Sequence, residues 1–185
     1  MERIVKSADR NLHKIEWLFA LIGGFALTVL MFMGFCQVIA RSMFQAPIHG
    51  ILDIIEQLMV PVAAMAIAYC QAKFGNVRMT LLVSKKPTRR KWIQEAFTYM
   101  IAVFVVGFIL KGSWGNFMRA WINGGDTPEI GIPIWIAILV VTASLGLLFL
   151  RVLLQLIEAG RLIVTPNSPT QIFEEELQLL ETSEL

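Results

Sequence analysis

The sequence predicts an all-α membrane protein with four transmembrane helices. Hydrophobic residues make up 56% of its 185 residues and charged residues only 16%, whereas about a quarter of an ordinary soluble domain is charged. The apolar residues fall in four separate blocks, each of about the length that crosses a bilayer core of roughly 30 Å. The net charge of +2 is small and the basic residues lie beside the apolar blocks, so we expect no nucleic-acid binding.

The chain divides into three parts. Residues 1–16 place apolar side chains at helical spacing among charged ones, which indicates a short amphipathic helix at the membrane surface; a solvated lead-in is the other interpretation. Residues 162–185 form an acidic tail that is either disordered or a short docking helix. Residues 17–161 form the membrane domain, and its spans are expected at about 17–40, 54–72, 92–111 and 130–151.

The first two spans carry small residues at helical spacing. The second has three alanines at steps of four, Ala64, Ala68 and Ala72. The first has a similar stripe, Ala20, Gly24 and Thr28. Small side chains let helices approach closely, which is a main source of helix association in lipid. We therefore expect these two helices either to pack together or each to dock on a partner.

Charges and prolines mark the ends of the third and fourth spans. The third begins at Trp92 and either ends at Lys111, whose ammonium would extend to the interface, or continues, tilted, through Phe117. The fourth is expected to start at Ile130, with Pro133 in its first turn, and to close at Arg151.

The distribution of basic residues predicts one topology. The segment between the second and third spans carries seven Lys and Arg residues. Counted over alternate sides of the membrane, the basic residues divide into thirteen and three. Because Lys and Arg beside a span resist translocation, both termini and the basic segment are expected in the cytoplasm.

The sequence contains no pattern typical of an enzyme. His13 and His49 both lie outside the expected spans, and no cluster of histidine, cysteine or carboxylate has the spacing of a metal site. The sequence has no nucleophile-elbow, zinc-protease or phosphate-loop motif. Cys36 and Cys70 each lie in an apolar block and are expected to be packed thiols. We therefore expect neither catalysis nor a cofactor.

Glu56 is the one acidic residue within an apolar block. Ionisable groups in a membrane are candidates for function because they are costly to hold in lipid. Its position in the first turns of the second span favours an interfacial residue that pairs with Arg41, at the end of the first span on the same side of the membrane. A proton or ion carrier is the other interpretation.

Several features taken together resemble the small membrane subunit of TRAP transporters, the tripartite ATP-independent periplasmic type. The likeness extends over roughly residues 17–161, outside which lie the first helix and the acidic tail. It departs from the family at Asn76, where a histidine is frequent. The matching features are Arg41 with Phe44, Glu56, the alanines at 63, 64, 66 and 68, Gly75 to Arg78, and Ile132, Pro133, Ile134 and Trp135.

This resemblance implies a scaffold in a multi-pass complex of the bacterial inner membrane. In such systems a large membrane subunit carries out sodium-coupled uptake of an organic acid, of carboxylate or sialic acid type, which a periplasmic binding protein delivers. The small subunit, surrounded by lipid, would bind and stabilise the large one, and none of its residues would bind substrate. The candidate structural or interface residues are Arg41, Glu56, Ala64, Ala68, Ala72, Gly75, Arg78, Pro133 and Trp135.

A second hypothesis belongs to another class of transporter. A stand-alone antiporter of four helices would use Glu56 as its proton site.

Overall fold

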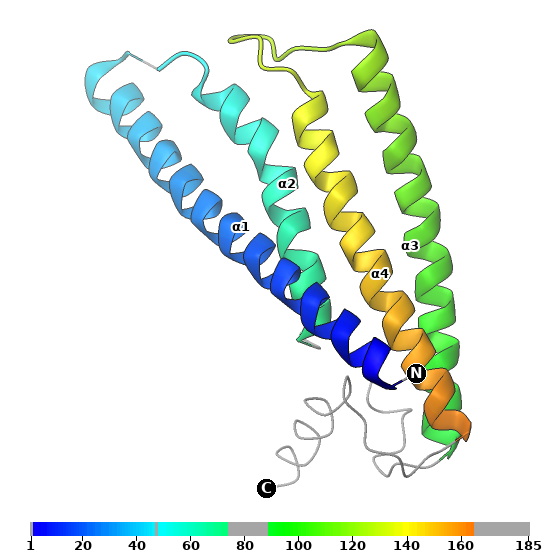
Figure 1. Ribbon diagram of the computed structural model, residues 1–185. Helices are drawn as coiled ribbons and strands as arrows, with labels where there is room; N and C mark the ends of the chain where they lie inside the picture. Colours follow the sequence, from blue (N-terminus) through cyan, green and yellow to red (C-terminus); the bar gives the residue numbers. More distant parts are fainter. Residues whose placement is uncertain (1, 47, 74–88, 165–185) are drawn as a thin grey trace, which may run out of the picture.

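Figure 1 shows the computed structural model of the protein, which describes residues 2–46, 48–73 and 89–164. These residues form four helices, each long and apolar enough to cross a membrane. The prediction of an all-helical protein with four helices of spanning length is thus confirmed. The helices are α1 (Glu2–Phe44), α2 (Ile51–Ala72), α3 (Arg89–Asn123) and α4 (Trp135–Val164).

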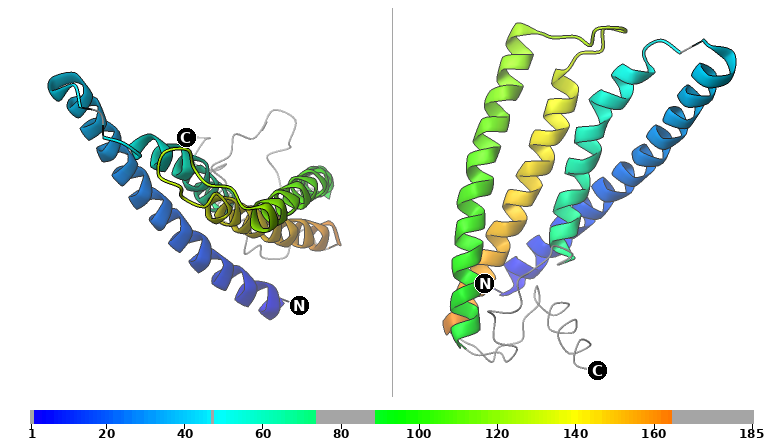
Figure 2. Two further views of the ribbon diagram at one scale, coloured as in Figure 1. Left: turned by 90° about the horizontal axis from the view of Figure 1, so that it is seen from above. Right: turned by 180° about the vertical axis from the view of Figure 1, so that it is seen from behind.

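The four helices form a spread layer and not a compact bundle. In the layer α1 packs on α2, α2 on α4 and α4 on α3, and α1 also reaches α4 through a small contact. Of the described helices, α3 touches α4 alone. Seen from above, α2, α4 and α3 stand in a row while α1 crosses beside them (Figure 2, left). The second half of α1 leans away from α2 (Figure 1), so most of its large apolar side chains are exposed.

The first helix is longer than expected. A single helix of 43 residues, about 65 Å long, runs from Glu2 to Phe44, where the sequence was expected to give a helix over 1–16 and a separate span over 17–40. The physical reason is that residues 12–20 contain no glycine or proline to interrupt the backbone between the amphipathic and the apolar part. A position of the first turns at the membrane surface stays a prediction.

The contact between α1 and α2 passes through Gly23. A Cβ atom at Gly23 would lie 3.2 Å from Cβ of Met65 and 3.4 Å from the carbonyl oxygen of Val62, whereas one at Gly24 would meet nothing within 4 Å. The two helices do pack together, but the expected stripe of Ala20, Gly24 and Thr28 is not the contact face. The buried residues Glu16, Gly23 and Leu30 are spaced by seven, which keeps them on one side of the helix.

The third and fourth helices differ from their expected bounds. Helix α3 continues past both Lys111 and Phe117 to Asn123. Helix α4 starts at Trp135, so Pro133 precedes the helix and is not part of its first turn, and it ends at Val164, well beyond Arg151. The late start has a local cause, because Gly131 has φ +67°, a conformation that ends regular helical geometry.

The connection between α3 and α4 folds as a tight loop. The backbone N–H of Ile134 donates to the carbonyl of Gly125 at 3.0 Å, and that of Thr127 donates to the carbonyl of Ile132 at 3.0 Å. The Thr127 hydroxyl oxygen in turn accepts the N–H of Ile132 at 3.0 Å. Several backbone polar groups of the loop are therefore paired within the loop itself.

Two carboxylates fasten this loop to the start of α2. One oxygen of the buried Asp53 accepts the backbone N–H of Glu129 at 2.8 Å and that of Ile130 at 3.0 Å. The Glu129 carboxylate accepts the N–H of Gly50 at 2.6 Å. Gly50 has φ +81°, and a Cβ there would collide with Ile130. We call this reciprocal pair of contacts the outer clasp, defined by Gly50, Asp53, Glu129 and Ile130.

Removal of the Asp53 carboxylate should loosen the outer clasp. The substitution Asp53→Ala leaves two backbone N–H groups without their acceptor, and we expect the midpoint of thermal unfolding in detergent to fall by roughly 2–4 °C. Glu56→Gln, one turn along the same helix at an exposed position, is the matched control and should leave the midpoint unchanged. Equal midpoints for Asp53→Ala and the wild type would show that the clasp does not stabilise the fold.

Candidate functional site

Arg41 and Glu56 lie at the same end of the layer as the outer clasp. Arg41 is exposed near the end of α1, and Glu56 is exposed in the second turn of α2. The structure does not bring the two into an ion pair: the ion pairs within its described part involve other side chains. At this end α1 leans away from α2 (Figure 1), which keeps the two charges on separate helices.

The expected alanine stripe is described only in part. Ala64 is buried, at 8% exposure, in the segment of α2 that faces Gly23 of α1. Ala68 and Ala72 belong to α2, but their side chains lie outside the described residues, as do Gly75 and Arg78 altogether.

Pro133 and Trp135 both make contacts within the chain. The carbonyl oxygen of Pro133 accepts a hydrogen bond from the Gln57 side-chain amide at 3.4 Å, which joins the start of α4 to α2. The ring of Trp135 meets that of Trp121 edge to face, with centroids 4.8 Å apart, and so joins α4 to the end of α3. The two residues position the start of α4 between its neighbours.

Glu56 borders a groove of about 860 Å³ on one face of the layer. Helices α2 and α3 form its walls and α4 its floor. Polar residues of the walls include Glu56 and Gln57 from α2 and Asn116 and Arg119 from α3, and the Arg119 guanidinium donates to the side-chain oxygen of Asn116. The floor is apolar, so the groove has charged residues in its walls and apolar residues at its base.

A second set of polar side chains is buried at the end of the layer away from the outer clasp. Glu16 of α1 and Arg151 of α4 are 0% and 4% exposed, and Nη1 of Arg151 lies 4.0 Å from Oε2 of Glu16. Nδ1 of His13 lies 4.0 Å from the same carboxylate oxygen, and the His13 ring stacks on that of Tyr69 in α2. The contact ties the first half of α1 to the second half of α4.

Further polar contacts continue along α4. The Gln71 side-chain amide of α2 donates to the side-chain oxygen Oε1 of Gln155 at 2.8 Å. Oε2 of Glu158 lies 3.5 Å from Nη1 of Arg161. Gln155 and Glu158 are buried, beside the apolar core that Trp92 and Tyr99 of α3 form with α4. We call Glu16, Gln71, Arg151, Gln155 and Glu158 the inner polar cluster.

Reasoning from the sequence missed the inner polar cluster. Arg151 was expected to close the fourth span, but it is buried and the helix continues. One signal was present, because Arg151, Gln155 and Glu158 follow at steps of four and three and so share one face of a helix. Their partners on α1 and α2 are far away in the sequence and leave no local pattern.

The described histidine, cysteine and acidic residues form neither a metal cluster nor a disulfide. In the described part of the chain, no group of three or more histidine, cysteine or acidic residues could hold a metal ion. Cys36 of α1 and Cys70 of α2 form no disulfide with each other. The buried polar groups described above pair with one another or with backbone, and such pairs hold helices together in lipid.

Comparison with known proteins gives one match. A family model described as "Tripartite ATP-independent periplasmic transporters, DctQ component" matches residues 30–162. No curated protein and no solved structure matches the chain.

The contact between Glu16 and Arg151 should appear as an energetic coupling. Glu16→Gln and Arg151→Met should each lower the free energy of unfolding. The double variant should lose about 0.5–3 kcal/mol less than the sum of the two single losses. The reason is that the second substitution removes a buried charge that the first left without its partner. Denaturant unfolding in mixed micelles measures the four free energies.

The control for this cycle pairs Glu16→Gln with Arg119→Met, at the other end of the layer, where the two losses should simply add. Additive losses for Glu16 and Arg151 as well would contradict the proposed contact.

Proposed function

Because the chain belongs to the DctQ component family of the tripartite ATP-independent periplasmic transporters, we propose that it is a non-catalytic scaffold that binds and stabilises the large transport subunit. That subunit would carry out sodium-coupled uptake of an organic acid, of carboxylate or sialic acid type, delivered by a periplasmic binding protein. The proposal for partner and substrate class rests on the family and not on any group in this chain.

The scaffold role is supported by the buried hydroxyls in the middle of α4, which hydrogen-bond within their own helix and so need no water. Within the described part of α4, the buried hydroxyls between its charged ends are those of Thr142 and Ser144, which donate to the carbonyls of Ile138 and Val140 in their own helix. Polar groups thus satisfied by their own backbone form no chain along which an ion would pass.

The shape of the layer supports the same proposal. The spread layer leaves many apolar side chains exposed, and in the second half of α1 these include Phe25, Phe32, Phe35 and Val38. Lipid can cover such a surface, but so can helices of a larger membrane protein, and small residues such as the exposed Gly24 allow close approach.

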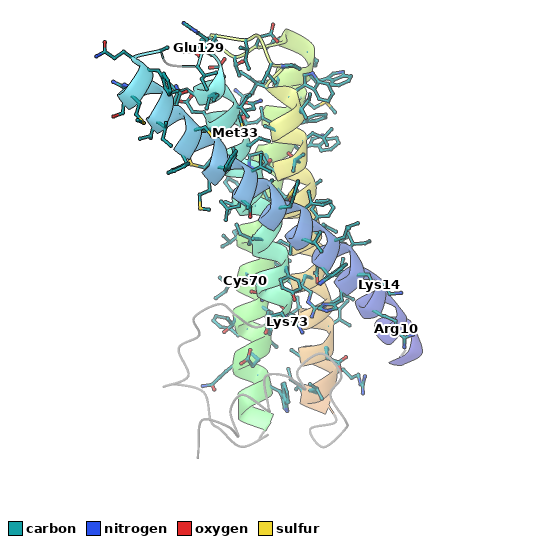
Figure 3. The ribbon with its side chains drawn as sticks, turned by 90° about the vertical axis from the view of Figure 1, so that its left-hand side faces the viewer. Arg10, Lys14, Met33, Cys70, Lys73 and Glu129 are labelled. Atoms are coloured by element: carbon teal, nitrogen blue, oxygen red, sulfur yellow. The ribbon has the colours of Figure 1, made fainter. Side chains whose placement is uncertain are left out.

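We propose that both termini lie in the cytoplasm and that the outer clasp faces the periplasm across the inner membrane. Figure 3 labels Arg10, Lys14 and Lys73 toward one end of the molecule and Glu129 at the other. The basic end carries the positive charge that stays inside during insertion.

Transport should require a second subunit. Vesicles that contain this chain alone should take up no labelled dicarboxylate or sialic acid under a sodium gradient, even with the binding protein added, because the chain offers no passage. Vesicles that contain both membrane subunits should take up the substrate of their binding protein. Uptake by the isolated chain would contradict the scaffold role.

The antiporter hypothesis is favoured by one observation: Glu56 lies in the wall of a groove whose opposite wall carries the cation Arg119. If the chain is a scaffold, vesicles holding it should show no proton flux when a sodium or potassium gradient is imposed, and Glu56→Gln should change nothing. A trapped pH-sensitive dye measures this flux. A flux in the wild type that Glu56→Gln abolishes would establish the antiporter instead.

A further inference from the structure

Lys111 places a positive charge near the middle of the layer. Its depth follows from two contacts that bracket it: the hydroxyls of Ser113 and Thr142 are 2.7 Å apart, and a Cβ at Gly107 would lie 3.3 Å from the ring of Phe149. Lys111 is therefore level with the part of α4 between Thr142 and Phe149. That part lies inside the uncharged run that extends from Trp135 to Leu150.

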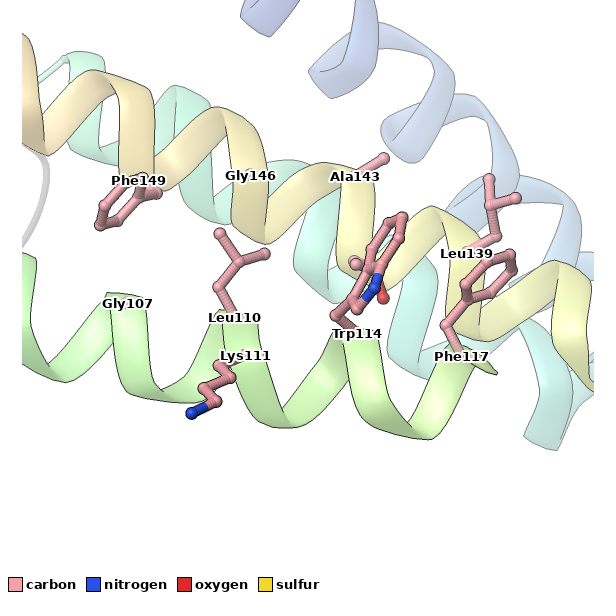
Figure 4. Close-up of a pocket in the computed structure, with 10 residues that line it drawn as sticks. Gly107, Leu110, Lys111, Trp114, Phe117, Leu139, Ala143, Gly146 and Phe149 are labelled. Carbon is pink, nitrogen blue, oxygen red and sulfur yellow. The ribbon is translucent and has the colours of Figure 1, made fainter. Parts of the chain in front are cut away.

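The Lys111 side chain points toward the N-terminal end of α3, away from the outer clasp (Figure 4). The nearest charge on α3 toward the outer clasp is Arg119, eight residues on, or about 12 Å along the axis. Side chains of a helix tilt toward its N-terminus, and the Lys111 ammonium indeed lies toward Gly107 and not toward Phe117 (Figure 4). The ammonium is thus held over the apolar middle of α3.

No acidic group of the described chain pairs with Lys111, whose side chain is exposed. Its surroundings are aromatic and apolar. Phe104 and Phe108, on the same side of the helix, are 77% and 75% exposed. Next to them an apolar groove of about 660 Å³ runs between α3 and α4, with Gly107, Ala143 and Gly146 in its lining (Figure 4).

Lipid can cover the phenylalanines and the groove, but it cannot neutralise the charge. Phosphate headgroups lie at the surfaces of the bilayer, while a cation in the hydrocarbon is costly unless an anion meets it there. An anion at this depth has to be a side chain of a membrane protein. Apolar side chains around that carboxylate would fill the groove, which has the small-residue lining that close helix approach requires.

We propose that this face of α3, defined by Phe104, Phe108, Lys111 and the adjoining groove, is the surface that docks the large transport subunit, through an Asp or Glu side chain of one of its membrane helices. This inference rests on the proposed function. It adds the face that is used and the chemistry of the partner residue.

The test is recovery of the large subunit with tagged small-subunit variants after mild detergent extraction of co-expressing cells. Lys111→Glu should reduce the ratio of large to small subunit more than tenfold, because two carboxylates would meet in hydrocarbon. Lys111→Met should reduce it several-fold and Lys111→Arg should retain it. The matched control is Asn116→Glu, at an exposed position about 140° round α3 from Lys111, which should keep the ratio within twofold of the wild type.

A second measurement separates docking from folding. The thermal midpoint of the small subunit alone should be equal or higher for Lys111→Met, since a charge without an anion is removed. A lower midpoint would assign Lys111 a role within the chain and overturn the proposal, as would a wild-type ratio for both Lys111→Glu and Lys111→Met. Failure of the wild type itself to recover a large subunit would instead overturn the proposed function, and this inference with it.

Discussion

The structure depends on one constraint: in lipid, apolar contact between helices gains nothing over contact with acyl chains. Helices must then be held by close approach at small residues and by polar groups that have no other partner. The layer uses both. Gly23 brings α1 against α2, and the hydroxyls of Ser113 and Thr142 join α3 to α4.

The polar contacts are concentrated at the two ends of the layer. At one end the outer clasp joins the start of α2 to the loop before α4 through carboxylates that accept backbone N–H groups. At the other, the inner polar cluster joins α1 and α2 to the second half of α4. Between these ends the described helices are mostly apolar, with Lys111 as their charged side chain, which suits a brace for other helices better than a passage for an ion.

Much of this architecture could be predicted from the sequence because it depends on local properties. Four apolar blocks predict four helices, and the turn residues before Ile130 predict a loop. The start of α4 could not be predicted, because Pro133 is acceptable in a first helical turn and only the hydrogen bonds of the loop exclude it. The buried position of Arg151 depends on Glu16, more than a hundred residues away, and the contact at Gly23 depends on which face α2 presents.

The candidate interface could be predicted less well than the fold. Trp135 and Pro133 were selected as structural or interface candidates, and the structure gives both contacts inside the chain. From the sequence, Lys111 was considered only as a possible end of the third span. Its depth in the layer becomes known only when α3 is aligned with α4. Interface residues of a membrane scaffold are recognised because their side chains have no binding partner within their own chain. A sequence does not show whether such a partner is present.

If this layer is one part of a larger membrane complex, the chain should leave its own membrane together with its partner. Native mass spectrometry of the chain, extracted with surrounding lipid retained, should then show one copy of this chain bound to one larger polytopic chain. A spectrum that contains only the single chain, or only copies of it bound to one another, would rule out such a complex.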